Sequence, residues 1–199
     1  NMKFAADFDQ VWFLSALETL GVTLSEEAQR AIFDPEFDAK KVNRADGVDL
    51  LLASAVNFYA PDITQAEAEA FYAAKVDADP DRPVSHGLNS RLSRDENGAI
   101  YEEVFSARGR YANSIKEIIG HLEKAKEVAE NDGQAAALTL LIEYYETGDL
   151  TKWDDYNIAW VKTTGGDVDY INGFVEVYND PMGYRGSYET VVQVKDFDA

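Results

Sequence analysis

The sequence predicts an α+β fold in which residues 1–199 form a single domain. Long stretches in the middle of the chain repeat apolar residues at helical spacing, and two pairs of strand-like segments are each joined by turn-forming residues. No internal repeat, low-complexity segment or linker divides the sequence. With 46% hydrophobic residues, the chain is long enough to bury one sizeable core.

Two helices are predicted near the N-terminus. Apolar residues recur at helical spacing from Asp9 to Leu20, and Gly21 ends this amphipathic helix. Ser25 is followed by two glutamates, which is typical of the N-cap and acidic first turn of a shorter helix that ends before Pro35.

The next stretch contains one ambiguous segment and one clear helix. Residues 37–47 lose the apolar period and are predicted to be a loop. Val48–Tyr59 is almost continuously apolar, and periodicity alone does not separate a buried strand from a buried helix. Thr64 and Glu67 have the spacing of a capping box, so a helix is predicted to follow over 66–74.

A loop and a hairpin come next. Residues 77–83 contain two prolines and three aspartates and are predicted to be a loop. The segments 89–93 and 100–105 flank Asn97 and Gly98, a pair that can adopt the positive φ angles of a tight turn. They are therefore predicted to form a β-hairpin.

Three helices are predicted in the centre of the chain. The first two have apolar faces over residues 115–129 and 138–145, and Gly133 separates them. Thr151, with Asp154 three residues later, has the spacing of a capping box that begins the third helix.

The C-terminal region is predicted to contain two strands, 174–179 and 187–196, joined by a proline- and glycine-containing turn. In an extended chain, Glu176, Tyr178 and Asp180 lie on one face. Patterning alone favours an ordinary half-exposed edge. The functional alternative is a cleft lined by a carboxylate and a phenol, where a ligand ammonium would bind.

The charge of the chain excludes several classes of partner. It has 37 acidic and 18 basic residues, which gives a net charge of −19. A polyanion is repelled by nucleic-acid phosphates and by anionic lipids, so neither nucleic acid nor a membrane is an expected partner. No run approaches the roughly 20 apolar residues of a membrane span. The chain is expected to be soluble, and the choice between cytoplasm and periplasm stays open.

The residues also argue against a metal centre within this chain. It has no cysteine, and its two histidines, His86 and His121, lie far apart in sequence. Asp77, Asp79 and Asp81 match the first three ligands of an EF-hand loop, but the glycine and the bidentate glutamate of that loop are missing. The adjacent acidic pairs at 102–103 and 154–155 are predicted to be solvated surface.

The segment from Gly173 to Glu189 resembles a signature of the dipeptidyl peptidase III family of zinc exopeptidases. It reads Gly-Phe-Val-Glu-Val-Tyr-Asn-Asp-Pro-Met-Gly-Tyr-Arg-Gly-Ser-Tyr-Glu. The family pattern there is Gly-Phe-x-Glu-x-Tyr-x-Asp-Pro-x-Gly, then a small insertion and an aromatic-Glu pair. From about Phe33 onward the chain is similar to bacterial members, particularly those of Bacteroides-like organisms.

The resemblance implies a two-lobed enzyme with a mostly helical catalytic lobe. The lower, substrate-binding lobe would contain a β-barrel-like or antiparallel sheet with several flanking helices. Zinc would be held by a His-Glu-x-x-Gly-His helix and a downstream glutamate, and neither motif is present in this sequence. The chain is therefore expected to be a fragment that precedes the zinc motif, with zinc in the longer protein and none in the fragment.

The resemblance also implies roles for three residues. Glu176 falls on the glutamate that receives the free amino terminus of a peptide substrate, and Tyr178 on the tyrosine that contacts the peptide backbone. Glu189 falls on a second acidic position near the same subsite. The implied partners are the peptide amino terminus and the catalytic lobe of the same polypeptide, and no catalytic residue is expected here.

Two hypotheses follow. The first is the substrate-binding lobe of a zinc-dependent dipeptidyl peptidase that is inactive in isolation. The second is a stand-alone, non-catalytic acidic binding module that keeps the family scaffold. The sequence that follows Ala199 distinguishes them. A glycosidase is disfavoured because it needs a defined pair of carboxylates and no sugar-stacking aromatic pattern is present.

Overall fold

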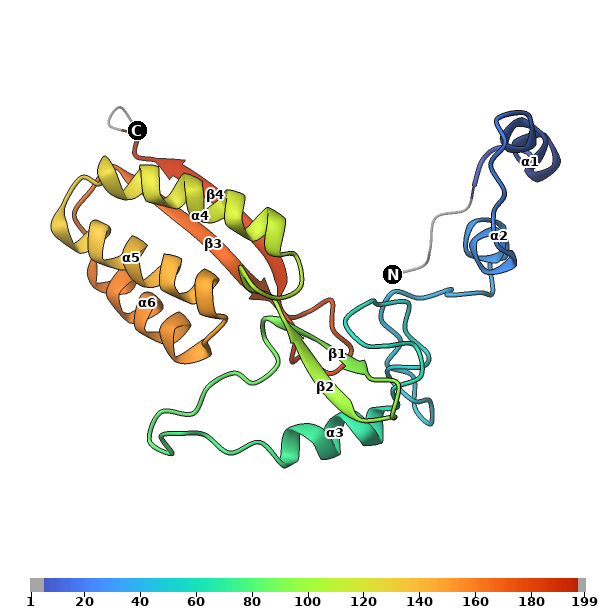
Figure 1. The fold of residues 1–199 in the computed structure, drawn as a ribbon, viewed down its shortest axis with the longest axis horizontal. Helices are drawn as coiled ribbons and strands as arrows, with labels where there is room; N and C mark the ends of the chain where they lie inside the picture. The colour runs from blue at the N-terminus through green and yellow to red at the C-terminus, as the bar shows by residue number, and fades with distance from the viewer. Residues whose placement is uncertain (1–5, 197–199) are drawn as a thin grey trace.

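The computed structural model describes residues 6–196 and has an α+β architecture (Figure 1). Helices α4, α5 and α6 lie beside the long ribbon β3–β4, and α3 lies beside the shorter hairpin β1–β2 (Figure 1). In chain order the elements are α1 (Gln10–Thr19), α2 (Glu26–Phe33), α3 (Gln65–Ala73), β1 (Ser90–Arg94), β2 (Ile100–Val104), α4 (Ala112–Glu127), α5 (Asp132–Thr147), α6 (Leu150–Lys162), β3 (Val168–Glu176) and β4 (Ser187–Val194). No helix within the described range is long and apolar enough to cross a membrane.

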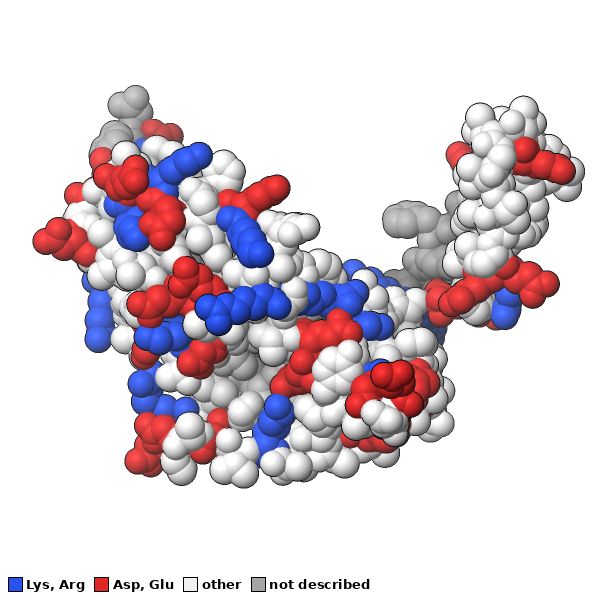
Figure 2. Space-filling view, in the orientation of Figure 1, with Lys and Arg blue, Asp and Glu red and all other residues white. Residues whose placement is uncertain are grey.

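The two N-terminal helices form where the sequence predicts them. The side chain of Asp9 caps α1 and the side chain of Ser25 caps α2, each accepting a hydrogen bond from a first-turn backbone N–H. Neither helix buries a residue. Instead the rings of Phe8, Phe13 and Phe33 contact one another at centroid distances of 5.0 to 6.0 Å. The pair projects away from the rest of the molecule (Figure 2).

The apolar stretch Val48–Tyr59 is neither of the two elements considered for it. It is a series of turns that places the side chains of Leu51 and Tyr59 in the buried core. The carboxylate of Asp49 accepts hydrogen bonds from backbone N–H groups within it, and the backbone of Leu92 in β1 bonds to both Phe58 and Ala60. These bonds give backbone groups of the stretch hydrogen-bond partners, so Leu51 and Tyr59 are buried although the stretch forms neither a helix nor a strand.

The predicted capping box of α3 is present. The hydroxyl of Thr64 accepts a hydrogen bond from the backbone of Glu67, whose carboxylate accepts one from the backbone N–H of Thr64. Arg94 pairs with the same carboxylate at 2.9 Å. The backbone bond from Thr64 and the bond from Arg94 lower the pKa of Glu67 to about 2.

The predicted hairpin is confirmed, with Ser90 opposite Val104 in the antiparallel pairing of β1 and β2. Its turn differs in detail from the prediction, because only Gly98 has a positive φ, of 87°. The carboxylate of Asp95 accepts the backbone N–H groups of both Asn97 and Ala99, which closes the turn without a second left-handed residue.

The three central helices are confirmed, but two of their starts differ from the prediction. Gly133 lies in the first turn of α5, and the preceding Asn131 is the N-cap of that helix. The N-cap of α6 is Asp149, whose carboxylate accepts the backbone N–H of Thr151 at 2.8 Å, so Thr151 is already helical. Gly148, with φ of 75°, ends α5.

The C-terminal strands pair as predicted, in an antiparallel ribbon, but β3 begins earlier and ends earlier than expected. A register shift lies between Phe174 and Glu176, and the chain leaves the strand before Tyr178. Each sheet in the described part of the chain has two strands, so the implied sheet takes its open antiparallel form and not that of a closed barrel.

Buried hydrophobic residues gather in two clusters, one on either side of the loop that joins β3 and β4. The larger cluster packs α4, α5 and α6 against Phe105 and Phe174. The smaller cluster combines α3 and β1 with the preceding turns: Leu51, Tyr59, Ile63, Ala68, Tyr72 and Leu92.

Candidate functional site

The three predicted site residues lie at one end of the β3–β4 ribbon. Glu176 ends β3 opposite Ser187, and Glu189 lies two residues further along β4. Because Glu176 pairs with Ser187, and Ser187 and Glu189 are two residues apart in β4, both carboxylates lie on one face of the ribbon. Tyr178 follows in the loop and is 66% exposed. No hydrogen bond or ion pair joins any of these three side chains to another residue in the range 6–196.

Asp180 does not share a face with Glu176 and Tyr178, contrary to the period-two prediction. Its exposure is 0%, whereas Glu176 and Tyr178 are exposed. The physical reason is that the strand is irregular after Phe174 and ends at Glu176, so the alternation of an extended chain does not continue into the loop.

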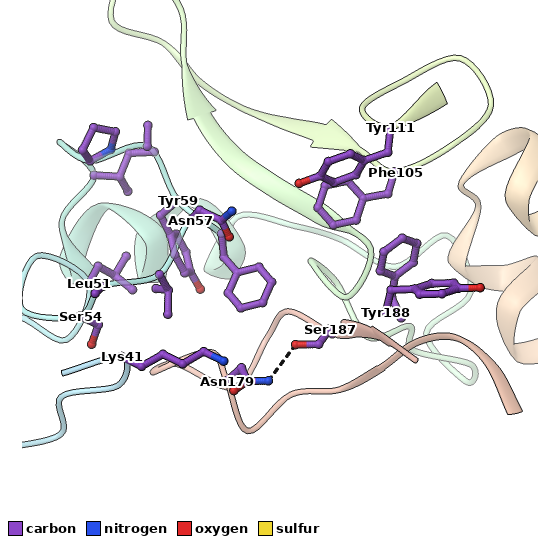
Figure 3. A pocket seen from close by; sticks show the side chains of 18 of the residues that line it. Lys41, Leu51, Ser54, Asn57, Tyr59, Phe105, Tyr111, Asn179, Ser187 and Tyr188 are labelled. Carbon is purple, nitrogen blue, oxygen red and sulfur yellow. Dashed lines mark hydrogen bonds between the residues drawn. The ribbon is translucent and has the colours of Figure 1, made fainter. Parts of the chain in front are cut away.

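A cleft of about 1010 Å³ lies beside this end of the ribbon (Figure 3). Aromatic rings of Phe105, Tyr111 and Tyr188 line one part of it, and the turns that precede α3 line another. Ser187, the strand partner of Glu176, also lines the cleft and accepts a hydrogen bond from the Asn179 amide at 3.0 Å. The predicted residues Glu176, Tyr178 and Glu189 do not line the cleft; they lie next to residues that do.

The loop between β3 and β4 folds around the buried carboxylate of Asp180. That carboxylate accepts backbone N–H groups from Met182, Tyr184 and Arg185 at 3.2, 2.8 and 2.9 Å. The hydroxyl of Tyr59, far away in sequence, donates to it at 2.9 Å. A buried carboxylate is stable only with such partners, and here they come from both the loop and the small cluster.

Arg185 carries a second buried charge of the loop, and its exposure is also 0%. Its guanidinium donates to the hydroxyl of Tyr59 at 3.1 Å and to the hydroxyl of Tyr72. It also lies over both rings, at 4.3 and 5.0 Å from their centroids. Tyr72 in turn donates to the carboxylate of Glu102, which accepts Lys75 at 2.7 Å.

Burial keeps these phenols protonated. It raises the pKa of Tyr59 and that of Tyr72 well above the usual range, even though the nearby Arg185 charge opposes this shift. Burial alone would also raise the pKa of Glu102, but hydrogen bonds from Lys75, Tyr72 and Ser90 outweigh it and hold that pKa below its usual value. Tyr59 and Tyr72 therefore stay protonated and Glu102 stays ionised at neutral pH.

Sequence reasoning missed Arg185, Tyr59 and Glu102. The pair at 102–103 was predicted to be solvated, yet Glu102 is largely buried and Glu103 pairs with Arg110 at 2.6 Å. The Asp-Pro-x-Gly turn marks the loop, but nothing local indicates that an arginine five residues after Asp180 is buried between two distant tyrosines.

Two of the remaining titratable candidates form ordinary side-chain pairs. His86 contacts Asp77 at 2.9 Å, and Asp155 pairs with Arg82 at 2.7 Å. Within residues 6–196, no group of three or more His, Cys, Asp or Glu side chains could hold a metal ion. The described residues therefore do not fit a zinc centre.

Comparison with known proteins identifies the family. The family model described as Peptidase family M49 matches residues 40–199. The chain belongs to this family. This confirms the resemblance to dipeptidyl peptidase III found in the sequence, and the match includes the whole β3–β4 ribbon and its loop.

Named relatives support the same family. The chain is 34% identical over 105 residues to dipeptidyl peptidase 3 of Mus musculus, which is 53% of this chain and 14% of that protein. It is 36% identical over 87 residues to dipeptidyl peptidase 3 of Homo sapiens, 44% of this chain and 12% of that protein. These alignments span a small part of the relatives' length.

Solved structures show the same fold. The dipeptidyl-peptidase III of Corallococcus sp. strain EGB superimposes with a TM-score of 0.57 at 18% identity, covering 92% of this chain and 34% of that one. The structure from Caldithrix abyssi has a TM-score of 0.57 at 19% identity, with the same coverage. The chain therefore has the fold of about a third of these proteins.

Proposed function

We propose that this chain is the substrate-binding lobe of a longer zinc-dependent dipeptidyl peptidase that releases dipeptides from peptide amino termini. Membership of peptidase family M49 supports the reaction class. The one observation that carries the binding role is that Glu176 and Tyr178 are exposed and unpaired within the described chain, while the loop beside them is held by buried charges.

The chemistry of the three residues suits a peptide amino end. The Glu176 carboxylate would accept the ammonium group, and the Tyr178 phenol would donate to a backbone carbonyl of the substrate. Glu189 would add a second negative charge on the same face. An exopeptidase that removes two residues must measure from the free amine, and a carboxylate at the end of a paired strand provides that reference point.

The neighbouring cleft supports the same proposal. It is mainly apolar and aromatic, with a few polar groups such as Asn179 and Ser187, which is the usual composition of a ligand pocket. Because Ser187 pairs with Glu176, a peptide whose amino end is at Glu176 would have its first side chains beside the cleft.

Zinc would be supplied by another part of the longer polypeptide, because the described residues do not form a zinc site. When bound there, zinc would activate water for hydrolysis. This chain would hold and orient the substrate and would be inactive alone.

The test is Glu176→Ala in the longer polypeptide. Loss of a charge-assisted hydrogen bond should lower kcat/KM by about 10- to 100-fold, with zinc content unchanged. The matched control is Glu146→Ala, which removes one exposed carboxylate from α5. Unchanged kinetics of the Glu176 variant would disprove the assignment.

A second measurement separates the enzyme lobe from a stand-alone binding module. The 199-residue chain and the longer polypeptide are each assayed for peptide hydrolysis and for binding of a peptide with a free or an acetylated amino end. We expect hydrolysis only by the longer polypeptide. A reading frame that stops after Ala199, together with binding of the free amine, would favour the module.

A further inference from the structure

We propose that Arg185 is a positioning residue. Through the hydroxyls of Tyr59 and Tyr72 it would fix the loop over residues 177–186, and with that loop the orientation of Tyr178 and Glu176 toward a peptide's amino end. The proposal rests on the proposed function, because it gives Arg185 a role in the same site.

The contacts of Arg185 are unusual for a buried charge. No carboxylate in the described chain lies within ion-pair distance of the guanidinium, which instead donates to two phenol oxygens. Each phenol hydroxyl donates a hydrogen bond to one carboxylate: Tyr59 donates to Asp180 and Tyr72 donates to Glu102. One hydroxyl thus links the guanidinium to a carboxylate on each side, while the buried Nε of Arg185 has no hydrogen-bond partner in the described chain.

The proton of each phenol sets the direction of these bonds. A hydroxyl has one hydrogen, and in both tyrosines it is directed to the carboxylate, at 2.9 Å in Tyr59 and 2.7 Å in Tyr72. The oxygen lone pairs are then left for the guanidinium. A lysine has no planar fork and would not reach both oxygens with the same geometry.

The network joins the loop to elements that are distant in sequence. Tyr72 belongs to α3 and Glu102 to β2, whereas Asp180 and Arg185 both belong to the loop. The backbone N–H of Gly186 also bonds to Leu88 at 2.8 Å. The β3–β4 pairing ends at Glu176 and Ser187, so contacts beyond the ribbon determine where Tyr178 lies.

The backbone of Gly87 packs directly against Tyr72 and Arg185. A Cβ atom on Gly87 would lie 3.0 Å from the Tyr72 hydroxyl and 3.2 Å from a terminal nitrogen of Arg185. Gly87 also has φ of 91°, where side chains are strained. The guanidinium is therefore enclosed by backbone on this side as well as by the two tyrosines.

The experiment uses Tyr59→Phe and Tyr72→Phe, singly and together, in the longer zinc-loaded polypeptide. Each variant keeps its ring over Arg185 and removes one acceptor oxygen. We expect KM for a peptide substrate to rise by about tenfold in the double variant, with kcat changed little and zinc content unchanged.

The matched control is Tyr145→Phe, which removes another buried hydroxyl, one that donates to Asn172 at 2.6 Å in the other cluster. It should lower the thermal midpoint but leave KM unchanged. If the Tyr59 and Tyr72 variants behave in the same way as this control, the role of the network is structural and the positioning proposal is overturned.

A double-mutant cycle with Glu176→Ala distinguishes the two proposals. If the tyrosines act through Glu176, their effect on KM should disappear in the Glu176→Ala background. If Glu176→Ala alone leaves kcat/KM unchanged, the proposed function fails. If Glu176→Ala raises KM and the tyrosine variants do not, the positioning role alone fails. If a double variant does not fold, the KM values of the single variants still test whether the tyrosines position the site.

Discussion

At position 173 the structure has room for glycine only. A Cβ atom there would lie 2.4 and 2.6 Å from carbons of the Trp153 indole ring, closer than carbon atoms approach in proteins. The Trp153 ring packs in turn against Tyr144 and Tyr156 and has little freedom to move. The first residue of the family signature therefore serves packing between α6 and the ribbon.

Gly173→Ala should destabilise the protein by about 1–3 kcal/mol, because the added methyl group overpacks this contact. Denaturant unfolding measures the change. Gly120→Ala on α4 is the matched control: no atom lies within 4 Å of the added methyl group, and alanine should stabilise the helix by about 0.5–1 kcal/mol. Equal unfolding free energies for both variants would contradict this account.

Among the candidate site residues, only those within a local sequence motif could be named from the sequence. The carboxylate and phenol at Glu176 and Tyr178 lie in a recognisable motif, and both are exposed. Arg185 could not be predicted, because its burial depends on Tyr59 and Tyr72, which lie more than a hundred residues earlier in the chain. Asp180 was predicted on the wrong face because the strand ends before it.

Among the elements, those with local start and stop chemistry were predicted best. The capping box of Thr64 and Glu67 and the turn at Gly98 each involve residues close in sequence. The backbone conformation of Val48–Tyr59 was not predicted, because an apolar run indicates burial but does not show which partners its backbone N–H and C=O groups will bond to. Its partners are the side chain of Asp49 and the backbone of Leu92.

The α3 capping box predicts a pH dependence of stability. The pKa of Glu67 is lowered from 4.5 to about 2 in the folded protein. A group with a depressed pKa stabilises the fold above its unfolded value and loses that contribution as pH falls. The difference in unfolding free energy between wild type and Glu67→Gln should therefore be constant above about pH 5 and shrink toward pH 2.

Urea unfolding at several pH values tests this. Glu69→Gln on the same helix removes one negative charge outside the capping box and serves as the control. A difference for Glu67→Gln that stays constant down to pH 2 would show that the carboxylate is not held in its ionised form by the fold.

For the molecule as a whole, we expect no stabilisation by metal. The described residues offer no cluster that could hold a metal ion, so excess zinc should leave the thermal midpoint of the 199-residue chain unchanged. Zinc binding at 100 times its Kd would stabilise the folded state by about 2.7 kcal/mol. A clear rise of the midpoint, absent when EDTA is added, would show a site in this chain.

The α1–α2 pair has a consequence for cooperativity. Its rings contact one another, neither helix buries a residue, and both helices precede the match that begins at residue 40. No residue of α1 or α2 belongs to either buried cluster, so we expect this pair to open locally at a lower free energy than global unfolding. Local fraying of residues 10–33 should therefore leave the Arg185 network folded, but it would move Glu27 of α2, which lines the cleft beside the candidate site.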